Sequence, residues 1–306
     1  MVKSKIQLRN VSNVAASKTV LIDLPIGPRY QHIQLQHGYS AGTNTIAGAM
    51  ANILAIRIKV NGKQQRVFGS GVATGSNQGG IELRDFNTLN QPAGSTAFDC
   101  TGLPNTAPGV TIPIYFAEPW RDTPADREAL AWPTSAWTSF QIEIDLGAAA
   151  TPTLTAFAII DASPAPSAAP FIAKVFRQQF NASGTAFDIA TLDRRDYLTQ
   201  ISLYPDSGSS QQTTEVDLRF NSQILDELTT PVRTAMLINR DMSPTATGRT
   251  ANMTDVVIEH DESLISNLLS GALNLNGSSD LALTVKAAGP MSGTIIALVE
   301  KIGPPE

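Results

Sequence analysis

The stretch IRIKVNG at residues 56–62 decides the fold, because it has the period of a half-buried β-strand and then stops at a turn. Apolar and charged residues alternate strictly, so one face of the strand is apolar and the other carries Arg57 and Lys59. Asn61-Gly62 is a strong signal for a two-residue hairpin turn. The stretch VDLRFN at residues 216–221 repeats this pattern position by position, at an offset of 160. The sequence therefore predicts one antiparallel β-structure that occurs twice.

Other predicted strands also occur in the same order in both halves. The offset between matched positions falls from 167 through 160 to 141, so the first half has the longer connections, for which residues 69–80 and 121–137 are the candidates. A predicted turn at 148–152 is matched by one at 287–290. The matched strands are 19–24 with Phe187 and Ile189, 30–36 with Tyr197, 140–146 with Leu283 and Val285, and 154–160 with Ile295.

Each half also has one predicted short helix late in its order of strands. In the first half Thr123 is the N-cap and Pro124 the first helical residue of a helix that reaches Leu130. In the second half Asp261 caps a helix over residues 262–269. A repeat that includes the helix favours a duplication, although any two antiparallel sandwiches would look partly alike.

Residues 161–170 contain three prolines and show no apolar periodicity, which is typical of an extended linker. The expected fold is all-β: two tandem eight-stranded antiparallel jelly-roll sandwiches, a double jelly roll, each with one short helix between late strands. The first sandwich is expected over residues 1–162, the linker over 163–174 and the second sandwich over 175–306.

Composition argues against several classes of function. The chain of 306 residues has a net charge of −5, which disfavours a surface that wraps nucleic acid. Cys100 is the single cysteine, and the three histidines lack the spacing of zinc ligands. No nucleophile motif is present, so neither an enzyme nor a bound cofactor is expected.

The N-terminus is mildly basic, with Lys3, Lys5 and Arg9 and no acidic residue among the first nine. A solvated arm is one interpretation, and contact with the headgroups of a lipid membrane is the other. The longest apolar stretch, residues 154–160, is far too short to span a membrane as a helix, and no secretory signal is recognisable. Synthesis in a cytoplasm is therefore expected.

Two groups of residues around the first predicted helix are candidates for binding. Asp122, Asp126 and Glu128 could bind Ca²⁺ through carboxylate oxygens, although acidic residues at a helix start are also favoured by the helix dipole. The second group could anchor a subunit interface or pack in the core; it consists of Trp120, Trp132 and Trp137.

Several segments resemble the major capsid protein of corticoviruses, which are tailless bacteriophages that contain a membrane. The similarity is closest over about the first 65 residues, and 142–145 and 176–180 are similar in kind. The residues that carry it are NVAA at 13–16, LPIG at 24–27, Tyr30 and VNGK at 60–63.

This resemblance implies a homotrimer whose six jelly rolls form a pseudo-hexagonal capsomer of an icosahedral shell over an internal membrane. The implied partners are further copies of the chain, penton and minor capsid proteins, and the membrane beneath, and the implied location is the virion. Two rival functions stay open. One is a carbohydrate-binding or adhesion module, which the low aromatic content of 6% disfavours; the other is a two-domain hydrolase with carboxylates from distant loops.

Overall fold

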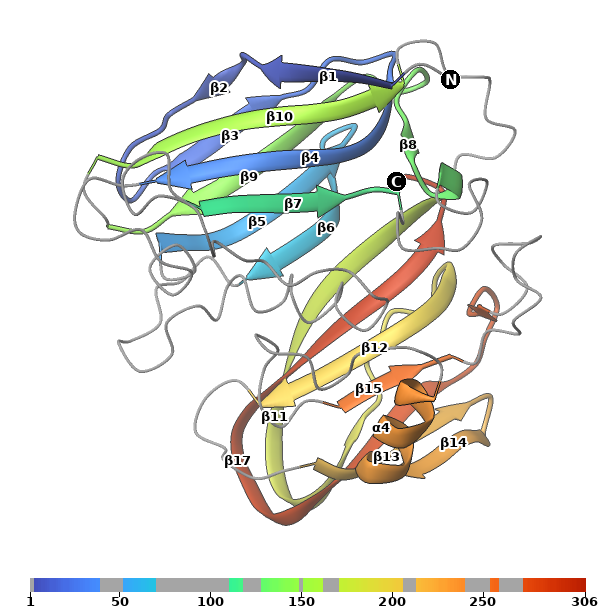
Figure 1. Cartoon of the computed structure of the whole chain (residues 1–306). Coiled ribbons are helices and arrows are strands. Elements are labelled where there is room, and N and C mark those ends of the chain that lie inside the picture. The colour runs from blue at the N-terminus through green and yellow to red at the C-terminus, as the bar shows by residue number, and fades with distance from the viewer. Residues whose placement is uncertain are drawn as a thin grey trace. The chain divides into compact units, whose positions relative to one another are not determined.

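The computed structural model in Figure 1 describes residues 3–38, 52–69, 110–117, 128–148, 151–161, 171–205, 213–239, 254–258 and 272–306. The described residues form two compact units. The first contains those up to Lys174 together with Pro304–Glu306, and the second contains Val175–Gly303. Both units are built mainly of antiparallel strands, as the sequence predicted.

The first unit consists of two antiparallel sheets that include eight strands longer than two residues. Counted along the chain, these strands follow the order first, eighth, third, sixth in one sheet and second, seventh, fourth, fifth in the other, which is the order of a jelly roll. One sheet contains β1 (Lys3–Leu8), β10 (Thr153–Asp161), β4 (Arg29–Gly38) and β7 (Val110–Tyr115), with the short β8 (Trp132–Pro133) paired to β4. The other contains β3 (Thr19–Asp23), β9 (Phe140–Leu146), β5 (Ile53–Val60) and β6 (Lys63–Gly69), with the short β2 (Val11–Ser12) beside β3.

Alternation along the strands creates the core of this unit. Every second residue of β9 is buried, and its polar residues face outward. Where β4 and β9 begin, the rings of Tyr30 and Phe140 lie 5.1 Å apart between their centroids. Trp132 adds a third ring, 4.5 Å from that of Phe116. Such edge and offset ring contacts stabilise a core beyond the area that they bury.

The second unit has the same order, but two long strands each take the place of two. Residues 281–287 of β17 pair with β13, and residues 295–302 pair with β12. β17 also pairs with β11, and Figure 1 shows both strands bending sharply along their length. The elements are β11 (Ile172–Ile189), β12 (Tyr197–Pro205), β13 (Thr213–Phe220), β14 (Gln223–Thr229), α4 (Thr230–Ile238), β15 (Thr254–Val257), β16 (Leu273–Asn274) and β17 (Leu281–Gly303).

The predicted turn at 287–290 is therefore wrong. The chain bends there without leaving the strand, and Gly293, with φ of +98°, takes up part of the bend. In the first unit the equivalent change of sheet is made by separate strands, β9 and β10.

The two units share their strand register, and the offsets read from the sequence reproduce it. Leu218 is 160 residues beyond Ile58, and Leu283 is 141 beyond Ile142; Ile58 pairs with Ile142 and Leu218 with Leu283. Both hairpins also carry a bulge at the same place, after Ile58 and after Leu218. Both units thus pair equivalent residues of strands that are far apart in the sequence, which is strong support for a duplication.

The turns that follow these strands match as well. The side-chain oxygen of Asn61 accepts hydrogen bonds from the backbone N and Oγ1 of Thr138, at 2.8 and 3.0 Å. Asn221 accepts the same pair from Ser279, at 2.8 and 3.1 Å. Both asparagines have positive φ, as the predicted hairpin turn requires.

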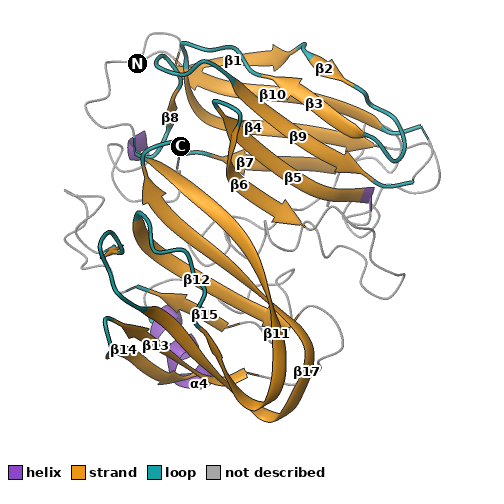
Figure 2. Ribbon diagram, turned by 180° about the vertical axis from the view of Figure 1, so that it is seen from behind, coloured by secondary structure: helices purple, strands orange, loops and turns teal. Residues whose placement is uncertain are grey.

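Helices and linker agree only in part with the sequence. The helix α4 was not predicted, although Pro231 in its first turn is a start signal. It follows β14 directly (Figure 2). The predicted helix at 262–269 lies outside the described residues, and of the predicted helix at 124–130 only Glu128 and Ala129 are seen to be helical. Most of the predicted linker is likewise outside them, and its last residues, 172–174, begin β11.

Candidate interaction surface

The strand β14 and the helix α4 expose an apolar surface on the second unit. The strand is the edge of its sheet, with β13 as its partner. Most of the exposed side chains of the strand and of the helix are apolar or uncharged, with Glu227 as the exposed charge, whereas a solvent-exposed surface usually carries more charged residues. The exposed side chains, which together form the β14–α4 surface, are Ile224 at 56%, Leu225 at 48%, Val232 at 49%, Met236 at 36% and Ile238 at 50% exposure.

A pocket of about 430 Å³ opens into this surface. Its walls come from α4, from β13 and β14, and from the end of β15. Apolar side chains predominate, and Asp226, Glu227 and Arg233 add charge at one side. A concave apolar site with a few polar groups is suited to an inserted apolar side chain. The apolar lining consists of Leu218, Leu225, Leu228, Met236, Leu237, Val257 and Ile258.

An ion pair between Arg233 and Asp226 holds α4 against the sheet. The Arg233 guanidinium, only 4% exposed, donates from both terminal nitrogens to the Asp226 carboxylate. It also donates to the backbone oxygen of Val216 at 2.8 Å. Bidentate charge-assisted hydrogen bonds of this kind are among the strong ones, so the helix has a fixed position on the strands.

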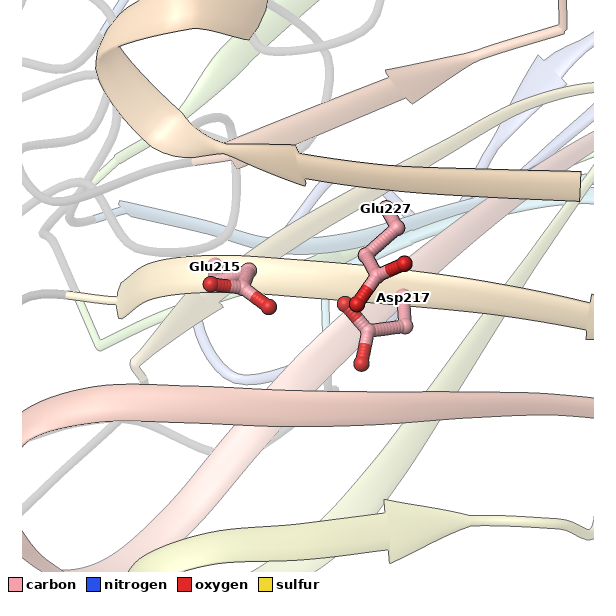
Figure 3. A group of neighbouring side chains, drawn as sticks. All are labelled: Glu215, Asp217 and Glu227. Carbon is pink, nitrogen blue, oxygen red and sulfur yellow. The ribbon is translucent and has the colours of Figure 1, made fainter. Parts of the chain in front are cut away.

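Three carboxylates lie along the same edge, on β13 and β14. Their ligand oxygens are within 4.8 Å of one another, and Figure 3 shows those of Asp217 and Glu227 facing each other. Lys286 lies beside the group and forms ion pairs with Glu215 and, at 3.1 Å, with Asp217. These pairs raise the pKa of Lys286 and lower that of Glu215. Because an ammonium group already occupies the site, we assign the cluster to charge balance and not to a metal ion.

Comparison with known proteins gives a family match for the first unit. Residues 5–73 and 100–162, all of them in the first unit, match the family described as the viral coat protein P2 N-terminal domain. The first unit is a viral coat protein domain. The match therefore indicates that the first unit is similar to a structural domain of a viral coat.

The fold of the chain is shared over its whole length by solved capsid structures. The major capsid protein P2 from bacteriophage PM2 has 20% identity and a TM-score of 0.70, with 99% of this chain and 98% of that chain covered. The STIV MCP has 12% identity and a TM-score of 0.64, covering 98% and 97%. The PBCV-1 virus capsid has 11% identity and a TM-score of 0.63, covering 98% and 93%. A comparison with curated protein sequences gives no match.

Two of the three tryptophans are part of the core of the first unit. Trp132 is fully buried and Trp137 is 7% exposed, and their rings are 5.7 Å apart. This burial agrees with the alternative of core packing and leaves these rings little surface for a partner. Trp120 lies outside the described residues. Around Trp132, the Arg66 guanidinium is 5.1 Å from the ring centroid and donates to the backbone oxygen of Ala173 at 2.8 Å.

Of the predicted calcium ligands, only Glu128 is described. It forms an ion pair with Lys3, with 2.7 Å between Nζ and Oε1, so its carboxylate already has a cationic partner. Asp122 and Asp126 lie outside the described residues, and a calcium site there stays a prediction.

The basic N-terminal residues do not belong to a free arm. Lys3 and Lys5 are in β1, which pairs with β10 along its whole length, and Arg9 follows it directly. The correction has a simple cause: Ile6 and Leu8 alternate with these polar residues, and the apolar side of the strand packs inward. Contact with lipid stays a prediction. Among the described residues, no helix is long and apolar enough to cross a membrane.

The β14–α4 surface was not predicted from the sequence. The signal was present, because QILDELT at 223–229 lacks the apolar alternation of a strand with one buried face. The aliphatic residues of TPVRTAMLI at 230–238 likewise exceed what one buried helical face needs, since only Thr230, Arg233 and Leu237 are buried.

Proposed function

We propose that the chain is a viral major capsid protein that forms homotrimers, in which six jelly rolls make a pseudo-hexagonal capsomer of an icosahedral shell. One observation carries the proposal: the two units have the same strand order and the same register. Three copies of a doubled module present six near-equivalent sides, which is what hexagonal tiling of a shell requires.

The finer features of the proposal follow from the resemblance to corticovirus capsid proteins. The shell encloses an internal membrane. Penton and minor capsid proteins occupy the positions in the shell that the pseudo-hexagonal capsomers leave open. The whole-length likeness to the structure printed as the major capsid protein P2 from bacteriophage PM2 supports this assignment.

The mass of the purified chain in solution tests the proposal. Size-exclusion chromatography with light scattering is expected to give three times the 32.5 kDa of one chain. Electron microscopy of the same fraction is expected to show particles with a hexagonal outline. If the chain has a mass of 32.5 kDa at every protein concentration, including those at which a virus assembles in its host, the proposal is contradicted.

A further inference from the structure

The strands β6 and β14 are equivalent in the two units and differ in what covers them. Each is the second strand of the hairpin whose turn and bulge match. Most of β6 is buried, whereas most of β14 is exposed. The difference is clearest at the bulge, where Gln65 is fully buried and its counterpart, Leu225, is 48% exposed.

The cover of β6 comes from two short segments of the first unit. β11 pairs with β6, and Arg66 of β6 donates to the backbone oxygen of Ala173, which lies in the part of β11 that belongs to the first unit. Pro304–Glu306 directly follows β17, and the backbone N of Glu306 donates to Oε1 of Gln65 at 3.3 Å. The start of β11 and the residues after β17 are thus the segments that satisfy this edge.

In the other unit, the element in the place of the start of β11 is β1. By chain order β11 replaces β1 and β3, just as β17 replaces β9 and β10. We call residues 3–9, which are β1 and the residue after it, the β1 segment. If the jelly rolls of a ring are arranged alike, with the first strand of each one covering the hairpin edge of its neighbour, then the β1 segment covers β14. In a ring of identical copies, the neighbouring copy supplies this segment.

Charge supports the same pairing. The β14–α4 surface is bordered by the acidic cluster, in which Glu227 is exposed and three carboxylates face one lysine. The β1 segment carries Lys3, Lys5 and Arg9, with no acid among the first nine residues of the chain. In the described residues Lys5 forms no ion pair, and its side chain is exposed. Opposite charges at the rim of an apolar contact steer association and fix its register.

We propose that the β14–α4 surface of one copy binds the β1 segment of a second copy. The inference rests on the proposed trimer and identifies the surfaces that form it. Because the two surfaces differ, the contact is head-to-tail, and such contacts close into a ring when the rotation allows it. Three contacts of this kind give each β14 the cover that β6 already has. Bare apolar edges would otherwise promote aggregation.

Substitutions at the apolar centre test the surface first. Leu225→Glu places a charge in the contact, and we expect it to raise the dissociation constant of the trimer at least about tenfold in sedimentation equilibrium. Ile26→Glu is the matched control, since Ile26 is similarly exposed, at 41%, but lies in a turn of the first unit. It is expected to leave the dissociation constant unchanged. Circular dichroism confirms that both variants are folded.

A charge exchange then tests the partner. Glu227→Lys and Lys5→Glu are each expected to weaken the trimer, by about threefold to tenfold, through like-charge contacts. The double variant Glu227→Lys/Lys5→Glu is expected to restore it, which a simple loss of folding cannot do. Equal dissociation constants for the parent and the Leu225→Glu variant, or a double variant as weak as the singles, overturn the inference. Both results leave the trimer of the parent chain intact, whereas a monomeric parent chain refutes the proposed function itself.

Discussion

The two units have one backbone plan and two different cores. At the end of the first unit where β4 and β9 begin, five aromatic rings pack together, and they belong to Tyr30, Phe116, Trp132, Trp137 and Phe140. The matching positions in the second unit, by register and turn hydrogen bonds, hold Tyr197, Ile258, Asn274, Ser278 and Leu281. Its core is mainly aliphatic. Strand pairing is therefore conserved between the units while the side chains that fill the interior are exchanged, as expected where shape and volume can be satisfied in several ways.

The charged residues show the same divergence. Arg66 and Asp226 are equivalent in the two hairpins, and each is held by its own unit. The arginine lies against aromatic rings and donates to backbone oxygens of Tyr115 and Ala173, while the aspartate accepts from Arg233 of α4. Opposite charges at one position are tolerated because each has local partners.

The largest expected effect of a substitution is at the aromatic cluster. Trp132→Ala removes a fully buried ring, and we expect it to lower the free energy of unfolding of the first unit by about 3–5 kcal/mol. Asn274→Ala, at the matching exposed position, is expected to cost less than about 1 kcal/mol. Urea unfolding followed by far-ultraviolet circular dichroism measures both losses, because it reports the strands of both units. If both substitutions lowered the free energy of unfolding equally, the two positions would contribute equally to stability although one holds a buried tryptophan and the other an exposed asparagine.

The second largest effect is expected at the ion pair between Arg233 and Asp226, which holds α4 against the sheet. Arg233→Met leaves the Asp226 carboxylate without its cation in a largely buried place, and we expect a loss of about 3 kcal/mol. The variant Arg233→Met/Asp226→Leu is expected to recover most of that loss, because no unpaired charge remains. Urea unfolding followed by far-ultraviolet circular dichroism measures both. No recovery in the double variant would mean that the arginine acts mainly through Val216 and its own packing.

Acid is expected to weaken the first unit through His37. Burial lowers the pKa of this residue to about 4, while its Nδ1 donates to the backbone oxygen of Thr153 and its Nε2 accepts from Asn52. Since the unfolded chain takes up the proton near pH 6.5 and the folded chain only near pH 4, stability is lost as the pH falls through that window and is unaffected above it. Because one pKa unit corresponds to about 1.4 kcal/mol, the change over this window is about 3 kcal/mol. Melting temperatures between pH 4 and pH 7 check it, and in His37→Gln this part of the pH dependence should vanish.

The smallest effect is expected at the hairpin turns. Ser222 has φ of +65°, where the equivalent residue of the first unit is Gly62 with φ of +79°. Ser222→Gly is therefore expected to stabilise the second unit by roughly 0.5 kcal/mol, and Gly62→Ser to destabilise the first by a similar amount. Thermal unfolding of the two variants measures the pair. Changes of the same sign would contradict the equivalence of the turns.

Alternation and turn signals were sufficient to predict most strands and even their register. The offsets of 160 and 141, read from residues 56–60 and 142–144 and their counterparts, gave the pairs that the structure contains. The continuous β17 could not be predicted, because GP at 289–290 is a turn signal that only the surrounding sheets override. The helix α4 was missed because its charge pattern is that of a surface with a partner, and a partner is not visible in one chain.

The location of the tryptophans also depended on the fold. Three such residues within 18 positions are equally compatible with an interface and with a core. Only the pairing of β8 with β4 places Trp132 against Phe116 and Arg66.

Electron cryo-microscopy of the purified oligomer tests the central claim most directly, which is that assembly makes the two unlike hairpin edges alike. The predicted map contains three chains in a ring, with residues of β1 from one chain against β14 and α4 of the next and with β6 covered within each chain. A map in which the chains meet elsewhere and β14 faces solvent would contradict it.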